Sequence, residues 1–161
     1  MIDKNRKKSI DDLVSELKSE YDTKNLEGLR QLSKDKEINV IESNKLILSF
    51  ADEINEKKYI FLGKTLFKKR KLINFTHEIG HHLLNHPMKE EYGINEIEKY
   101  ETEAIYFQEQ LYNKELNVMN LYVDAFYKIM TRPLDCLKYS FLKSFPESHA
   151  KKIIKNYNSQ K

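Results

Sequence analysis

Hydrophobic residues recur at helical spacing near the start of the chain. The pattern predicts a helix over residues 9–20, with Ser9 as its N-cap, and a second helix over residues 21–33. Apolar residues recur every three or four positions in both: Ile10, Leu13, Val14, Leu17, Leu26, Leu29 and Leu32. Neither segment carries a chemical motif, so we interpret both as packing elements.

The hydrophobic period then shortens to that of strands. Residues 38–41, 45–50 and 58–62 are short runs rich in β-branched and aromatic residues, and residues 51–57 are polar. These runs predict a small, mostly antiparallel sheet of three strands, with residues 51–57 as a turn. Such a sheet can pair its edge strand with an extended peptide, or it can simply complete the core.

Helical spacing returns in the second half of the chain. It predicts a long helix from about Leu72 to Pro87, with the basic residues 67–72 in the loop before it because cations oppose the helix dipole at an N-terminus. The next helix is predicted over residues 96–113, with Asn95 as its cap. Three more helices are predicted in the tail, over residues 116–130, 134–145 and 147–157. We therefore expect a mainly helical α+β fold, with a domain over residues 1–130 and a helical extension over residues 131–161 packed on it.

Composition and charge narrow the classes of function. The chain has 161 residues, of which 40% are hydrophobic and 33% charged, and a net charge of +3. This balance argues against nucleic acid as the main partner. The single Cys136 excludes an internal disulfide and fits a reducing compartment. The charged N-terminus does not resemble a signal peptide and no apolar run is long enough to span a membrane, so we expect a cytoplasmic protein.

The main chemical signal is an H-E-x-x-H motif formed by His77, Glu78 and His81. Residues four apart lie one above the other on a helix, so the two imidazoles can bind one metal ion without bending the backbone. Glu78 lies about 100° further round the helix, where it can take a proton from water. This pattern is typical of a hydrolytic zinc site, and the alternative is a surface helix that happens to be rich in histidine. Gly80 costs a helix about 1 kcal/mol, which indicates that something packs closely against its backbone.

A third ligand is expected from the next helix. Glu103 precedes Ala104 on the apolar side of that helix, and a carboxylate is rarely buried unless it is paired or bound to metal. We therefore expect Glu103 to be the third ligand. Glu101 is about 200° away from it on the helix and is expected to be solvated, and Glu98 is a weaker rival. His86 is excluded as a ligand, because it lies nine residues from His77 and hence on the opposite side of an ideal helix.

Two blocks of this sequence resemble the ImmA/IrrE metallopeptidases. Residues 75–84 are similar to the family's H-E-[LI]-G-H-x-[LI]-L, and residues 101–107 are similar to its E-x-E-A-[ND]-x-F-A. The resemblance covers roughly residues 38–112. It implies that His77, His81 and Glu103 hold one Zn²⁺ per chain, with Mn²⁺ as the other candidate metal, and that Glu78 is the general base. It also implies a regulatory endopeptidase of a phage, mobile element or stress response that cleaves a helix-turn-helix repressor.

Departures from the family pattern support a second hypothesis. The family usually has Asn or Asp where Ile105 stands and Ala where Gln108 stands, and residues 113–114 replace its Met-Pro. The alternative is therefore an anti-repressor that contains metal but acts by protein binding, without proteolysis. A third hypothesis is direct DNA binding through residues 67–72 and the C-terminal helices. A donor for the oxyanion remains open among five residues: Tyr92, Tyr100, Tyr106, His82 and His86.

Overall fold

The computed structural model describes residues 2–43, 46, 49–63, 68–87, 94–112 and 155. The chain divides into two compact units, residues 1–113 and 114–161, and the first unit holds every described residue except Lys155. The domain boundary predicted after residue 130, and the three helices predicted between residues 116 and 157, lie outside the described residues apart from Lys155.

Two helices form the N-terminal part of this unit. Helix α1 spans Lys4–Glu20 and begins earlier than predicted, because the Asp3 side chain caps it by accepting the backbone N–H groups of Asn5 and Arg6, each at 3.0 Å. Helix α2 spans Leu26–Asp35 and begins later than predicted, with Asn25 as its N-cap. The first turn of α2 packs so closely on the preceding loop that a Cβ at Gly28 would lie 1.9 Å from the carbonyl oxygen of Asp22.

A three-stranded sheet comes after these helices, in the order β1-β3-β2. Strand β1 (Ile38–Ser43) runs parallel to β3 (Lys57–Gly63), and β2 (Phe50–Ile54) runs antiparallel to β3. The sheet is therefore mixed, whereas the sequence predicted a mostly antiparallel one. The second strand also lies later than predicted, because residues 51–54, which were predicted as part of the turn, belong to β2. Only Asn55 and Glu56 make the turn, and both have the positive φ of a tight hairpin, 52° and 61°.

Helices α3 (Lys68–Leu83) and α4 (Ile94–Tyr112) complete the unit. Helix α3 begins at Lys68 and not near Leu72, since the exposed cations of its first turn stay solvated and oppose the dipole only weakly. It ends four residues before Pro87, where Asn85 adopts a left-handed conformation with φ 54°. The N–H groups of Asn85 and His86 then bond to the carbonyls of His82 and His81, which closes the helix with a Schellman motif. Asn95 lies inside α4 and does not precede it as a cap.

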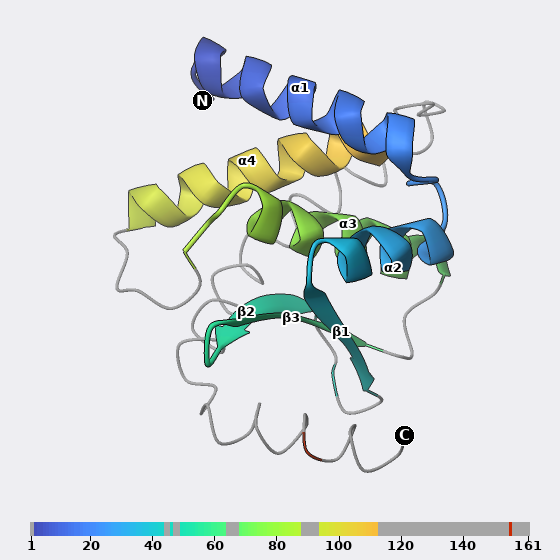
Figure 1. Cartoon of the computed structure of the whole chain (residues 1–161). Coiled ribbons are helices and arrows are strands. Elements are labelled where there is room, and N and C mark those ends of the chain that lie inside the picture. Colours follow the sequence, from blue (N-terminus) through green and yellow to red (C-terminus); the bar gives the residue numbers. More distant parts are fainter. Residues whose placement is uncertain are drawn as a thin grey trace. The chain divides into compact units, whose positions relative to one another are not determined.

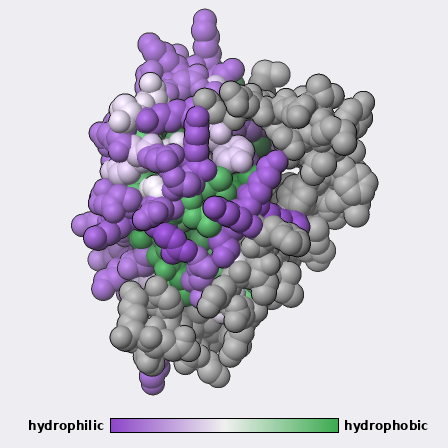
Figure 2. Space-filling view, turned by 90° about the vertical axis from the view of Figure 1, so that its right-hand side faces the viewer, coloured by the Kyte–Doolittle hydropathy of each residue, from purple (hydrophilic) through white to green (hydrophobic). Residues whose placement is uncertain are grey.

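The elements stack in layers (Figure 1). Helices α1 and α4 pack together above α3, and α3 covers one face of the sheet through β3 and β2, while α2 packs on β1 and α3. Apolar residues of all four helices and of strands β1 and β3 form one core. On the face shown in Figure 2, hydrophobic residues show between hydrophilic ones in the middle of the described part. None of the helices in the described ranges is long and apolar enough to cross a membrane. The predicted fold class, a mainly helical α+β fold with a three-stranded sheet beside the H-E-x-x-H helix, is confirmed.

Candidate metal centre

The site is built where α3 and α4 pack together. Gly80 on α3 faces the buried ring of Phe107 on α4, and a Cβ at Gly80 would lie 2.8 Å from the Phe107 Cδ1 atom. The close approach predicted at Gly80 is therefore confirmed, and its cause is this aromatic ring. The absence of a side chain lets the two helices come near enough for groups from both to meet.

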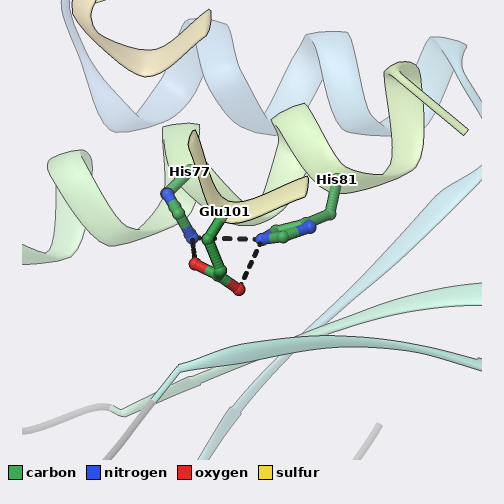
Figure 3. Close-up of side chains that lie close together, drawn as sticks. All are labelled: His77, His81 and Glu101. Carbon is green, nitrogen blue, oxygen red and sulfur yellow. Dashed lines mark hydrogen bonds and ion pairs between the residues drawn. The ribbon is translucent and has the colours of Figure 1, made fainter. Parts of the chain in front are cut away.

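Three side chains converge between these helices. The Nε2 atoms of His77 and His81 lie 3.1 Å apart. The Glu101 carboxylate, which comes from α4, places Oε2 at 3.2 Å from His77 Nε2 and Oε1 at 3.4 Å from His81 Nε2. Figure 3 shows the two imidazoles and the carboxylate pointing toward one another. Among the described residues, this is the one group of three or more His, Cys, Asp or Glu side chains whose donor atoms lie close enough together to hold a metal ion.

The spacing of these donor atoms fits a small tetrahedral metal. Nitrogen and oxygen ligands lie about 2.0–2.1 Å from zinc, so two ligand atoms at a tetrahedral angle are separated by about 3.3 Å. The Nε2 atoms of His77 and His81 lie 3.1 Å apart, near that value, and the two oxygens of Glu101 approach them at 3.2 and 3.4 Å, one oxygen to each imidazole. Two imidazoles and one carboxylate are also the ligand types of catalytic zinc sites that leave the fourth position open.

The charge of Glu101 is strongly favoured in this setting. Burial alone would raise the pKa of the Glu101 carboxyl, but hydrogen bonds with His77 and His81, and the charge of those imidazoles, outweigh it and hold the pKa far below its usual range. The side chain remains 31% exposed, whereas those of His77 and His81 are 12% and 11% exposed. The cluster therefore offers a negative charge at a position that solvent can reach.

Glu78 lies beside this cluster and not within it. Its side chain is buried, and its Oε2 atom accepts the backbone N–H of Ala51 at 2.9 Å. Ala51 belongs to β2, which is an edge strand within the described sheet. The predicted base is thus next to His77 in the sequence and is held by the sheet edge that lies under α3.

The structure places Glu103 away from the predicted ligand set. Its Oε2 atom lies 2.7 Å from Arg6 Nε and 3.2 Å from His86 Nε2, and its side chain is 2% exposed. Sequence reasoning expected Glu103 at the metal and Glu101 in water; in the structure Glu101 faces the two imidazoles, and Glu103 is buried against Arg6 and His86. The reason is that the buried carboxylate of Glu103 has a cationic partner, Arg6, so its burial does not require a metal ion.

The remaining histidines and tyrosines near the site are already engaged in hydrogen bonds or ring contacts. His82 Nε2 lies 2.9 Å from the carbonyl oxygen of Tyr59, and burial lowers the His82 pKa. The Tyr106 hydroxyl donates to Asp11 at 2.6 Å; burial, followed by this bond, raises the Tyr106 pKa to about 12. The ring of Tyr100 packs against that of His86, with centroids 4.9 Å apart. Tyr92 lies outside the described residues.

Two contributions escaped the sequence reasoning. Glu101 stands three residues before the buried Ala104, so it is only about 60° from the apolar side of α4, and this angle was a usable signal. Arg6 lies 97 residues from its partner Glu103 in a strongly charged stretch, and no local pattern singles it out.

Comparison with known proteins adds one finding. The profile of the IrrE N-terminal-like domain family, Peptidase_M78, matches residues 34–131, which is more than half of the chain. The match includes both predicted blocks and confirms the resemblance seen in them. Neither the curated proteins nor the solved structures give a match.

Proposed function

The chain belongs to the IrrE N-terminal-like domain family of peptidases, and from this premise we propose that it is a zinc-dependent endopeptidase whose metal is held by His77, His81 and Glu101. The observation that carries the proposal is the convergence of two imidazoles and a carboxylate, from two helices, with one donor atom of each residue within 4.8 Å of the others. Glu101 takes the place that sequence reasoning assigned to Glu103, since Glu103 is occupied by Arg6.

The chain's own residues supply the proton transfers. A zinc ion held by His77, His81 and Glu101 would polarise a peptide carbonyl and lower the pKa of water. Glu78 accepts a proton from the attacking water and later passes it to the leaving amine. The bond from the Ala51 N–H orients the Glu78 carboxylate for this work. Because β2 is an edge strand of the described sheet, an extended substrate can pair with it beside the base.

A peptidase acts on proteins, and we propose a helix-turn-helix repressor as the substrate, in the cytoplasm. This proposal rests on the family resemblance of the two sequence blocks and on the lone Cys136, which fits a reducing compartment. The rival is a non-proteolytic anti-repressor, which is favoured by the apolar Ile105 at a position where the family usually has a polar residue.

The test combines metal analysis with cleavage. Elemental analysis of the purified wild type should give about one zinc per chain. Glu78→Gln should keep that zinc and lose cleavage of a repressor substrate by about 10²–10⁴-fold, because the general base is gone. A fully active Glu78→Gln enzyme would contradict the mechanism. A Glu78→Gln variant that cannot cleave but still relieves repression in cells would favour the anti-repressor.

A further inference from the structure

A chain of buried side chains leads away from the candidate metal centre. His81 Nδ1, on the side of the ring opposite the ligand atom, lies 3.0 Å from His86 Nδ1. His86 Nε2 lies 3.2 Å from Glu103 Oε2, which in turn lies 2.7 Å from Arg6 Nε. The side chains of His86 and Glu103 are 1% and 2% exposed. The chain thus joins the end of α3, helix α4 and helix α1.

The contacts along this chain determine which nitrogens carry protons. Glu103 Oε2 accepts the Nε–H of Arg6, and a carboxylate facing His86 Nε2 requires that nitrogen to donate as well. A neutral imidazole that donates from Nε2 accepts at Nδ1, so His86 accepts the Nδ1–H of His81. With Nδ1 as the donor to His86, the nitrogen of His81 left to bind a metal ion is Nε2, the atom that faces His77 and Glu101. The hydrogen-bond order therefore selects the tautomer of His81 that can bind a metal.

Backbone contacts hold the same residues in place. A guanidinium nitrogen of Arg6 donates to the carbonyl oxygen of Leu84 at 3.1 Å, just beyond the end of α3. The left-handed Asn85 then turns the chain so that His86 comes back toward His81. Arg6 therefore anchors both the carboxylate that orients His86 and the turn that carries His86.

We propose that His86, Glu103 and Arg6 are positioning residues that set the orientation and tautomer of His81 for zinc. This inference rests on the proposed function, since it takes His81 as a ligand. Partners that hold the outer nitrogen of a ligating histidine typically contribute 10–100-fold to metal affinity. Arg6 lies outside the matched residues 34–131, so helix α1 takes part in the metal centre from beyond the family domain.

The competing explanation is purely structural. Arg6 and Glu103 could serve only to fasten α1 to α4, and loss of either would then lower the stability of the fold without changing metal binding. Two measurements on the metal-free protein and its zinc complex separate these roles: the free energy of unfolding without metal, and the zinc dissociation constant from competition with a chromogenic chelator. The visible spectrum of the Co²⁺ complex adds a direct view of ligand geometry.

The variants remove or conserve each hydrogen bond. His86→Leu and Glu103→Leu remove the acceptors, while His86→Gln and Glu103→Gln keep an amide oxygen that can accept. Arg6→Gln removes the anchor at a partly exposed position, 32% exposed, and should therefore fold. Glu98→Gln, at an exposed position of the same helix as Glu103, is the matched control.

We expect His86→Leu, Glu103→Leu and Arg6→Gln to weaken zinc binding 10–100-fold and to alter the Co²⁺ spectrum, with partial recovery in the two glutamine variants at His86 and Glu103. Glu98→Gln should bind zinc like the wild type. Folded variants with wild-type affinity would overturn this inference while leaving the proposed metal centre intact. A wild type that binds no zinc would overturn both. Should the leucine variants fail to fold, Arg6→Gln and the glutamine variants decide the outcome by the same criterion.

Discussion

Two carboxylates on helix α4, only two residues apart, have opposite surroundings. Glu101 faces the imidazoles of His77 and His81 and is 31% exposed, whereas Glu103 is 2% exposed and faces Arg6 and His86. The more buried carboxylate is the one whose charge a permanent cation already balances. The more exposed carboxylate, Glu101, faces two imidazoles instead, and imidazoles can bind a metal ion together with it. The partner, and not the depth of burial, therefore decides which carboxylate is available as a ligand.

The largest expected effect is on zinc affinity, in which Glu101 and Glu103 should differ most. Glu101→Ala removes a donor atom, so we expect zinc affinity to fall by more than about 100-fold, beyond the 10–100-fold typical of residues that only support a ligand. Competition with a chelator measures this, and elemental analysis should show that the purified variant has lost its zinc. Wild-type affinity in Glu101→Ala would return Glu103 to the position of third ligand. Glu98→Ala, on the exposed side of α4, is the control.

The ranking of Glu101 and Glu103 should reverse when the free energy of unfolding is measured without metal. Glu103→Ala leaves Arg6 and His86 without their shared acceptor, and breaking a buried pair costs about 3–5 kcal/mol. We expect a value near the lower end, about 3 kcal/mol, because Arg6 is partly exposed. Glu101→Ala should cost less, about 1 kcal/mol, since the Glu101 side chain is 31% exposed and solvent screens its pairs with the two imidazoles. Urea unfolding with a chelator present gives both values, and equal losses would contradict the comparison.

A smaller effect is expected from a substitution between α3 and α4 that shifts both carboxylates at once. Gly80→Ala places a Cβ against the Phe107 ring and forces α3 and α4 apart. Overpacking costs about 1–3 kcal/mol, and the better helix propensity of Ala returns about 1 kcal/mol. We therefore expect a net loss of up to about 2 kcal/mol in unfolding free energy together with weaker zinc binding. Combining Gly80→Ala with Phe107→Leu should restore part of both, and a stabilised Gly80→Ala protein would show that the helices can adjust.

Local signals predicted one half of the site and not the other. His77, Glu78 and His81 share one helix, so their spacing alone places them near one another. The choice between Glu101 and Glu103 depends on tertiary contacts. The two residues flank the buried side of α4 at opposite edges, and the docking of α1 brings Arg6 to the edge that carries Glu103. A helical wheel shows that Glu101 lies near the apolar side, but it does not show that Glu103 meets Arg6.

The misplaced second strand has a similar cause. Phe50, Asp52 and Ile54 are the buried positions of β2, in the alternation expected of a strand. A charged residue at the middle buried position hides the apolar alternation, so the segment looks like a polar turn. The first helix shows the same effect, because its first turn is so rich in charge that only the Asp3 cap marks its start.

The smallest expected effect tests the comparison at a third carboxylate, Glu42 on β1. It pairs with Arg30 and, at 3.0 Å, with Lys71 on α3, but its side chain is 18% exposed. Burial alone would raise the Glu42 pKa, yet the hydrogen bond from Lys71 and the charge of Arg30 outweigh it and lower the pKa below 4.5. A lowered pKa in the folded state means that Glu42 stabilises the protein above pH 4.5, and that this contribution is lost as the pH falls through the folded-state pKa.

Glu42→Gln should therefore cost about 1 kcal/mol at pH 7. Unfolding measured in urea at decreasing pH should show the wild type and the variant converging in acid. A difference that stays constant with pH would show that Glu42 acts by packing. It would also weaken the explanation that Arg6 makes the burial of the Glu103 carboxylate possible.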